Sequence, residues 1–325
     1  MGKKAIIVVW LVALALTLFR LADAQQQKRV PRIGYLSLMG RPNSPVPSIE
    51  AFRLGLRDLG YVEGQNIVIE YRFAEGKRDR LPELAAELVR LNVEVIVAGD
   101  SAAISSAAQA TRSISIVMSV SDDPVGTGYI ASLARPGGNI TGLSNVSVDL
   151  AGKRLELLKE VVPKLSRVAV FGPTRNPDWT EFVNAATTMG IKLQTLKVRD
   201  SKEFEGAFEL ARRERAAGLI VLPSPLTNSY RRQIVTLAAK SRLPTMYPLE
   251  EYVEEGGLIA YGPNIPEMHR RAAVYVDKIL KGRKPADLPV EQPMKFEFVI
   301  NLKAAKQIGL TIPPNVLARA DKVIK

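Results

Sequence analysis

Polar side chains follow several short apolar runs in this sequence, at the positions where buried strands would end. These residues are Ser37, Ser101, Ala102, Ser119 and Ser121 in the first half of the chain, and Asn176, Ser224 and Tyr247 in the second half. Loops at the carboxyl ends of parallel strands present hydroxyl and backbone N–H groups that suit a carboxylate or another small anion. Any one of these residues could instead cap a helix. Their recurrence in both halves favours a ligand held between two similar units.

Groups that could catalyse a reaction or bind a metal are scarce. The chain has no cysteine, which excludes disulfides, thiolate metal ligands and a cysteine nucleophile. His269 is the single histidine, and without an evident partner we expect it at the surface or boundary of a helix. No G-x-S-x-G elbow or G-x-x-x-x-G-K-[ST] phosphate loop occurs, and GTG at 126–128 lacks the rest of a dinucleotide fingerprint. We therefore expect no enzyme activity, no cofactor and no metal.

The stretch DDPVGTGYIASLARPGGNITGL at 122–143 combines two carboxylates with two prolines and several glycines. Neighbouring side chains point apart, so the adjacency of Asp122 and Asp123 does not make an acid–base pair. Asp123 precedes Pro124, which is the arrangement of a helix N-cap followed by its first residue. The stretch thus predicts a capped helix, and Asp123 is a candidate ligand contact beside that structural role.

The first 24 residues have the pattern of an export signal. Lys3 and Lys4 precede an uncharged apolar run over 5–19, and Ala22-Asp23-Ala24 fits a small-x-small cleavage site. An uncleaved membrane anchor is the alternative, but the run is shorter than the roughly 20 apolar residues that span a bilayer. Because no cysteine could carry a lipid, we expect export to the periplasm through a cleavable Sec signal, without a lipid anchor.

The net charge of +12 raises the question of nucleic-acid binding. The basic clusters, such as RRER at 212–215 and KGRK at 281–284, are scattered along separate segments and have no aromatic residues between them. Scattered clusters of this kind are typical of solvated helix faces. We expect no nucleic-acid partner.

Strands and helices alternate along the chain from Val30 onward. VPRIGYLSL, NIVIEYRF, VEVIVAG and SISIVMSV are typical of buried strands, and helical stripes such as Ile49-Phe52-Leu56 lie between them. The pattern restarts at SRVAVFG (166–172), and EVIVAGDS (94–101) corresponds in it to GLIVLPSP (218–225). This order predicts an α/β fold with two Rossmann-like, doubly wound parallel-sheet lobes. One spare helix and one spare strand near the C-terminus predict a chain that crosses repeatedly between lobes, as at a hinge.

Three stretches resemble the exported substrate-binding proteins of a widespread, largely uncharacterised family of ABC transporters. They are DDPVGTGYIASLARPGGNITGLS at 122–144, GGLIAYGPN at 256–264 and the run from Arg270 to Ile324. The resemblance implies the type I periplasmic-binding-protein fold, in which three segments join the lobes, and members that bind amino acids, including aromatic ones. It implies a first lobe of 31–145 plus 264–285 and a second lobe of 146–263 plus 286–325.

The same resemblance implies roles for the candidate residues. Ser101, Ser119 and Ser121 would hold the charged ends of a ligand from one lobe, and Asn176, Ser224 and Tyr247 would close from the other. NITGLS at 139–144 would lie at the first crossing, Tyr261 and Asn264 would lie near the second, and 285–293 near the third. Family members often have GDPVG where this chain has DDPVG, so Asp122 departs from the usual pattern.

The expected function is capture of a small polar solute, an amino acid or a related carboxylate, by a monomer that closes around it. Its partners would be the permease and ATPase subunits of an ABC importer in the inner membrane. Two alternatives stay open: a sensor partner of a membrane receptor, and a hydrolase-like enzyme on the same fold. Turnover of the bound ligand would identify the enzyme, and neighbouring permease and ATPase genes would separate transport from sensing.

Overall fold

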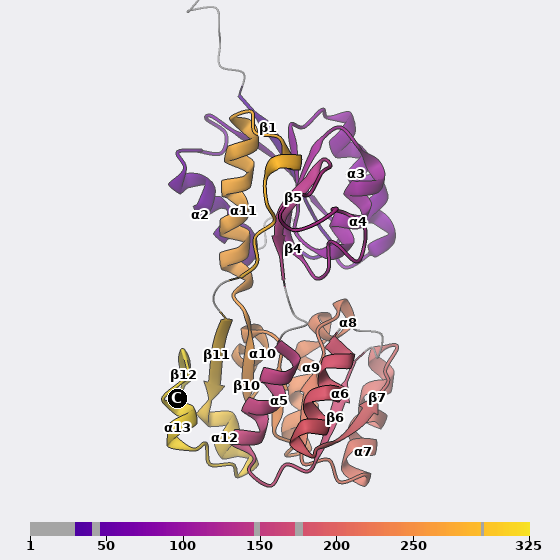
Figure 1. Ribbon diagram of the computed structural model, residues 1–325, viewed down its shortest axis with the longest axis vertical. Helices are drawn as coiled ribbons and strands as arrows, with labels where there is room; N and C mark the ends of the chain where they lie inside the picture. The colour runs from indigo at the N-terminus through magenta and orange to yellow at the C-terminus, as the bar shows by residue number, and fades with distance from the viewer. Residues whose placement is uncertain (1–29, 41–45, 146–149, 173–177, 294–295) are drawn as a thin grey trace, which may run out of the picture.

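Two α/β lobes stacked along the long axis of the molecule make up the fold (Figure 1). The computed structural model describes residues 30–40, 46–145, 150–172, 178–293 and 296–325. Within this part of the chain, no helix is both long enough and apolar enough to cross a membrane. The predicted fold class, two parallel-sheet lobes covered by helices, is confirmed.

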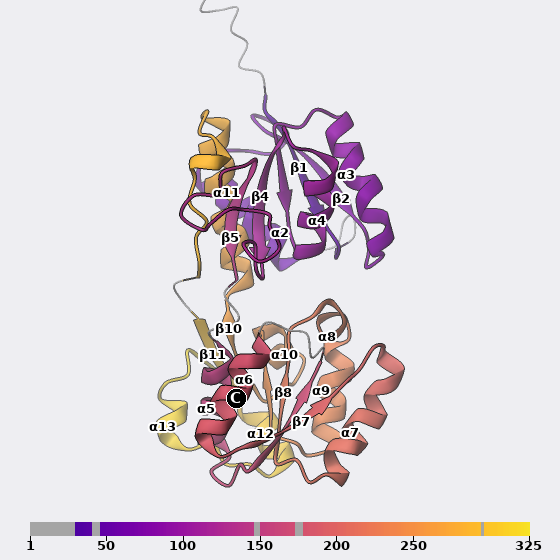
Figure 2. The same cartoon turned by 45° about the vertical axis from the view of Figure 1, so that its right-hand side comes forward.

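The first lobe contains a five-stranded sheet in which every strand pairing is parallel. Its order is β2-β1-β3-β4-β5, formed by β1 (Arg32–Ser37), β2 (Val68–Phe73), β3 (Val95–Ala98), β4 (Ser115–Ser121) and β5 (Ile140–Ser144). Helices α3 (Leu81–Arg90) and α4 (Ser101–Ala110) cover one face, and α2 (Pro47–Asp58) and α11 (Ile265–Leu280) cover the other (Figure 2). Successive strand residues serve opposite faces: Leu36 packs under α3 and α4, whereas Tyr35 packs under α2 and α11.

The second lobe has a seven-stranded sheet of order β12-β11-β10-β9-β8-β6-β7. The strands are β6 (Arg167–Phe171), β7 (Lys192–Leu196), β8 (Gly218–Val221), β9 (Thr245–Tyr247), β10 (Ile259–Pro263), β11 (Phe296–Asn301) and β12 (Lys322–Ile324). All pairings are parallel except that of β10 with β11. The order β7-β6-β8-β9-β10 repeats β2-β1-β3-β4-β5 of the first lobe, so the predicted correspondence of 94–101 with 218–225 pairs β3 with β8.

Helices cover both faces of this second sheet as well. One face carries α5 (Leu150–Val161), α6 (Asp178–Met189), α12 (Leu302–Ile308) and α13 (Pro314–Leu317). The other carries α7 (Phe204–Arg213), α9 (Arg231–Lys240) and α10 (Glu250–Glu254). The short helix α8 (Pro225–Ser229) follows β8 and lies on the side of this lobe that faces the first lobe (Figure 1). Three single 3₁₀ turns are η1 (Arg78–Arg80), η2 (Ser201–Glu203) and η3 (Pro285–Asp287).

Helix α11 belongs to the first lobe although it directly follows β10 of the second. It packs on α2 at Gly55, where an added Cβ would lie 2.4 Å from the backbone oxygen of Arg270. Its buried residues Met268, Ala272 and Val276 join the core beneath it. The first lobe is therefore completed by a segment that comes more than a hundred residues after its last strand.

The helix predicted after Asp123 is wrong. Residues 122–139 contain turns but no helix or strand. The Asp123 side chain does cap a turn, because its Oδ1 accepts a hydrogen bond from the Gly126 N–H at 2.8 Å. Gly128 then adopts a φ of +74°, a left-handed conformation that ends the turn before a helix can propagate. The NITGLS segment, expected to be the first crossing, forms β5, and the crossing follows it.

The third crossing begins later than the resemblance implied. The Thr141 Oγ1 donates a hydrogen bond to the Leu288 carbonyl at 2.7 Å, and the Ser144 N–H donates one to the Glu291 carbonyl at 2.9 Å. The side chains of Leu288 and Val290 are buried in the first lobe. Residues 286–291 therefore lie with the first lobe rather than the second, because their backbone continues the edge of its sheet at β5.

Candidate functional site

The carboxyl ends of β1, β3 and β4 bring the polar residues of the first lobe together. Asp100 follows β3 and accepts hydrogen bonds from the Ser37 Oγ at 2.9 Å, the Leu38 N–H at 2.7 Å and the Ala103 N–H at 2.9 Å. It therefore caps α4 and fixes the end of β1 to the start of that helix. Asp100 was not among the predicted residues, although an acidic residue directly before a helix is a recognisable N-cap signal.

Ser101 and Asp122 are joined directly at this end of the sheet. The Ser101 Oγ, on the first residue of α4, donates a hydrogen bond to the Asp122 Oδ2 at 3.0 Å. Asp122 is exposed to solvent, yet enough protein surrounds it that desolvation raises its pKa. The Ser101 hydrogen bond lowers that pKa and the charge of Asp100 raises it, with the net direction upward. Ala102, the next residue of α4, is half-buried.

The two candidate serines of β4, Ser119 and Ser121, are both buried, but they differ in their contacts. The carbonyl of Ser121 accepts hydrogen bonds from the Asn145 N–H at 2.6 Å and from the Ser144 Oγ at 3.3 Å, so it ties β4 to the start of the first crossing. Ser119 is fully buried, and its Oγ has no hydrogen-bond partner among the described residues. Neither side chain reaches the surface of the lobe, which sets both apart from Ser101 and Asp122.

In the second lobe, Ser224 occupies the position that corresponds to Asp100. It follows β8, and its Oγ accepts a hydrogen bond from the Thr227 N–H at 3.1 Å, which caps α8. Tyr247 is different, because its ring is buried in the core and stacks on Tyr252 with centroids 5.0 Å apart. The expected ligand contact of Tyr247 therefore does not fit its position, since β9 directs this side chain inward. Asn176 lies outside the described residues.

Tyr261 and Asn264 lie at the second crossing, on β10 and just before α11. The Tyr261 carbonyl accepts a hydrogen bond from the Nε of Arg154, a buried arginine of α5, at 2.8 Å. Asn264 caps α11, because its Oδ1 accepts from the Glu267 N–H at 2.7 Å. Its Nδ2 donates to the Glu297 Oε1 at 2.8 Å, which links the second crossing to β11.

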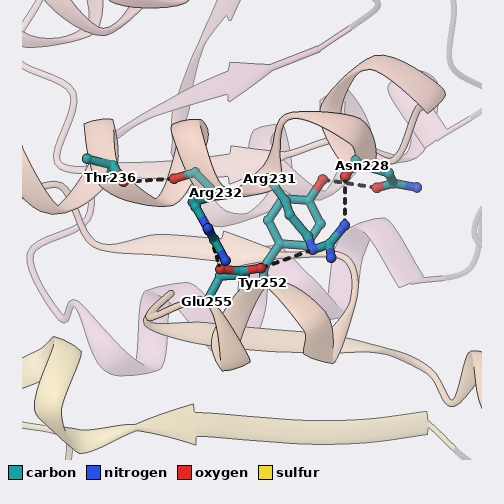
Figure 3. A network of polar contacts seen from close by, with 6 residues as sticks. All are labelled: Asn228, Arg231, Arg232, Thr236, Tyr252 and Glu255. Carbon is teal, nitrogen blue, oxygen red and sulfur yellow. Dashed lines mark hydrogen bonds and ion pairs between the residues drawn. The ribbon is translucent and has the colours of Figure 1, made fainter. Parts of the chain in front are cut away.

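A polar network holds the helices around α8 in place (Figure 3). The Tyr252 hydroxyl donates a hydrogen bond to the Asn228 Oδ1 at 3.0 Å, and the Arg231 Nη1 donates one to the Asn228 carbonyl at 3.3 Å. Glu255 lies 2.8 Å from the Arg232 Nε and 3.8 Å from the Arg231 Nε. These contacts join α8, α9 and α10. No sequence pattern pointed to them, since the partners come from three separate helices.

His269 is buried, so the expectation of a surface or boundary histidine is wrong. Its Nδ1 lies 3.0 Å from the Tyr35 hydroxyl on β1, and burial lowers the pKa of the imidazole to about 3. The position follows from the packing of α11, which turns His269 toward the sheet while Arg270 pairs with Asp58 on the outside. A neutral imidazole that is buried and lies within hydrogen-bond distance of the Tyr35 hydroxyl is a core group here.

Other surface features of the described residues do not indicate a catalytic or metal-binding site. A hollow of about 630 Å³ lies along α7, at the end of the second lobe away from the first (Figure 1), and is lined by Gly206, Glu209, Leu210, Arg212 and Arg213. No group of three or more His, Asp and Glu residues in the described part of the chain could hold a metal ion. The polar residues of interest remain those at the carboxyl ends of the two sheets.

Two sheets of matching strand order, with polar helix caps at β3 and β8 and several crossings between lobes, define the type I periplasmic-binding-protein fold. Residues 46–324 match the family of ABC transporter substrate binding proteins, and the chain belongs to that family. Its members are substrate-binding proteins rather than enzymes, and they typically act outside the cytoplasm.

Similar proteins are known from several bacteria. The chain is 26% identical over 292 residues to a tyrosine-binding protein of Clostridioides difficile. This alignment covers 89% of this chain and 83% of that protein. A solved ABC domain from Streptococcus pneumoniae in complex with L-Trp is 25% identical, with a TM-score of 0.80 over 90% of this chain and 99% of that one. A conserved domain protein from Vibrio cholerae is 27% identical, with a TM-score of 0.81 over 91% and 100%.

Proposed function

We propose that this protein captures a small polar solute, an amino acid or a related carboxylate, between its lobes and delivers it to an ABC importer. The similar proteins favour an aromatic amino acid, because one is a tyrosine-binding protein and another was solved with L-Trp. The permease and ATPase subunits of the importer would be its partners, and the protein would act as a periplasmic monomer. The export signal expected over 1–24 lies outside the described residues.

The observation that carries this proposal is the equivalence of the two lobes at their sheet ends. Ser101 follows β3 and Ser224 follows β8, and these strands hold the same place in the repeated strand order. Both residues lie at the start of a helix, where their hydroxyl groups can contact the polar groups of a solute. A solute that contacts both lobes binds the closed state more tightly than the open one, and this differential affinity drives closure.

Thermal denaturation with candidate solutes tests the proposal. We expect L-tyrosine or L-tryptophan to raise the melting temperature of the mature chain, since a ligand at 100 times its Kd stabilises the folded state by about 2.7 kcal/mol. In a chain of this size that corresponds to a shift of several degrees. D-ribose at the same concentration serves as the control. An unchanged melting temperature with both amino acids, or recovery of the solute in a chemically altered form, would contradict the proposal.

A further inference from the structure

The helix terminus in the first lobe that would suit a solute carboxylate already holds one from the protein. Asp100 accepts the Ala103 N–H within the first turn of α4, as well as the Leu38 N–H and the Ser37 Oγ from the end of β1. An anion at the same position would meet both an occupied cap and a fixed negative charge. This end of the first lobe is therefore unfavourable for the carboxylate of a solute.

Asp122 adds a second negative charge at the same end of the sheet, and this one is accessible. It directly follows β4, it is exposed, and its Oδ2 accepts the Ser101 Oγ. No ion pair to a lysine or arginine is formed by Asp100 or Asp122 within the described part of the chain. Among the described residues, the Asp122 carboxylate accepts a side-chain hydrogen bond only from the neutral Ser101 hydroxyl. The negative charge of Asp122 can therefore pair with a cationic group of a solute.

Exposed apolar side chains lie on loops at the same end of the sheet. Met39 follows the end of β1 and is 47% exposed, and Val125 lies in the turn after Asp123 and is 43% exposed. A carboxylate and exposed aliphatic side chains at one end of a sheet match a solute with a cationic group attached to an apolar body. Aromatic amino acids carry such a group at their ammonium end.

We propose that Asp122 determines specificity by binding the ammonium group of the solute, which turns its amino end toward the first lobe. This inference rests on the proposed function, because it concerns the same interlobe site. A solute without an ammonium group should then bind weakly, whereas removal of the solute carboxylate should matter less at this lobe. The charge on Asp122 makes the main difference, because Ser101 alone cannot compensate an ammonium ion.

Calorimetry with three related probes and two variants tests the assignment. The probes are L-tyrosine, tyramine, which lacks the carboxylate, and 3-(4-hydroxyphenyl)propanoate, which lacks the ammonium group. Asp122→Asn removes the proposed contact. Glu94→Gln removes the same charge from an exposed residue that precedes β3, at the opposite end of the same sheet, and serves as the matched control. L-tryptophan and tryptamine replace the first two probes if L-tyrosine does not bind.

We expect Asp122→Asn to weaken the binding of L-tyrosine and tyramine roughly 10- to 100-fold, as loss of one partner from a desolvated charge pair does. Glu94→Gln should leave both affinities unchanged, and the affinity for the propanoate should not fall in either variant. Circular dichroism and melting temperature establish that Asp122→Asn folds, and Asp122→Ser provides a second variant that keeps a polar side chain.

The outcomes separate this inference from the proposed function. If L-tyrosine or L-tryptophan binds the wild-type chain and Asp122→Asn binds it as tightly as Glu94→Gln does, the ammonium assignment is wrong and the proposed function stands. Tighter binding of the propanoate than of tyramine would also overturn the assignment. If neither amino acid binds the wild-type chain, both the proposed aromatic amino-acid ligand and the proposed ammonium contact of Asp122 are wrong.

Discussion

His269 shows how a single buried side chain can make stability depend on pH. The imidazole lies between α11 and β1, where it contacts the Tyr35 hydroxyl, and burial keeps it neutral. Its pKa is lowered from 6.5 to about 3, so the unfolded chain takes up a proton at a higher pH than the folded chain does. This contribution to stability is complete above pH 6.5 and is lost as the pH falls from 6.5 toward 3.

We therefore expect the variant His269→Gln to have a flatter pH dependence than the wild-type chain. Between pH 7 and pH 5 the wild type should lose about 2 kcal/mol more unfolding free energy through this group, since each pH unit in the window is worth about 1.4 kcal/mol. Urea denaturation at both pH values measures the difference. Parallel losses in the two proteins would show that His269 is not kept neutral by the fold.

The sequence showed which residue types lie at the strand ends but not which way each side chain points. Ser101 and Ser224 were found because a polar residue after an apolar run marks the end of a strand. Tyr247 met the same criterion, yet it faces the core, because a one-residue change of register reverses the direction of a strand side chain. Asp122 was noticed as part of a carboxylate pair and as a departure from a motif, but its link to Ser101 depends on a contact between the start of α4 and the separate segment after β4.

At the scale of elements, the contact between α2 and α11 decides how the first lobe is completed. Gly55 allows the two helices to approach until a Cβ would be 2.4 Å from the Arg270 oxygen and 3.0 Å from the Ala273 Cβ. The Arg270 backbone cannot move aside for an added Cβ as the end of a flexible side chain could. The smallest possible residue is therefore required at this helix crossing.

We expect Gly55→Ala to destabilise the protein by about 1–3 kcal/mol, as overpacking of a close helix contact does. Gly206→Ala is the matched control, since Gly206 also lies within a helix, α7, and its Cβ would meet nothing within 4 Å. That change should stabilise the protein by about 0.5–1 kcal/mol through helix propensity. Urea denaturation of both variants checks the pair, and equal effects of the two substitutions would contradict the close contact.

The alternation of strands and helices could be predicted from the sequence because buried parallel strands are continuous apolar runs, as in VEVIVAG before α4. The turn at 123–129 could not, because Asp123-Pro124 begins a helix and a capped turn in the same way. The difference lies in Gly128, whose left-handed backbone is visible only in the structure. The late position of the third crossing likewise depends on backbone hydrogen bonds of 288–291, and these cannot be predicted from the residue types.

At the scale of the whole molecule, the crossings between lobes allow relative movement while each lobe keeps its own core. The core clusters are separate, two in each lobe, and the Asn264–Glu297 hydrogen bond ties the second crossing to β11. A solute that bridges the lobes should therefore change their relative position with little change inside either lobe.

We expect the radius of gyration of the mature chain to decrease when L-tryptophan or L-tyrosine binds, because closure brings two compact bodies together. Small-angle X-ray scattering at saturating amino acid measures this, with D-ribose at the same concentration as the reference. Identical scattering curves for the free and the bound chain, with binding established by calorimetry, would mean that the lobes do not close.

The late position of α11 has a consequence for how the chain is made. Until residues 265–291 leave the ribosome, the sheet face that carries Tyr35 and Val117 is covered by α2 without α11, and the edge at β5 lacks its bond to Glu291. The nascent first lobe therefore stays incomplete through most of synthesis, even though all its strands have been made. Such a delay leaves part of the apolar sheet face of the first lobe uncovered until the C-terminal segments have been made.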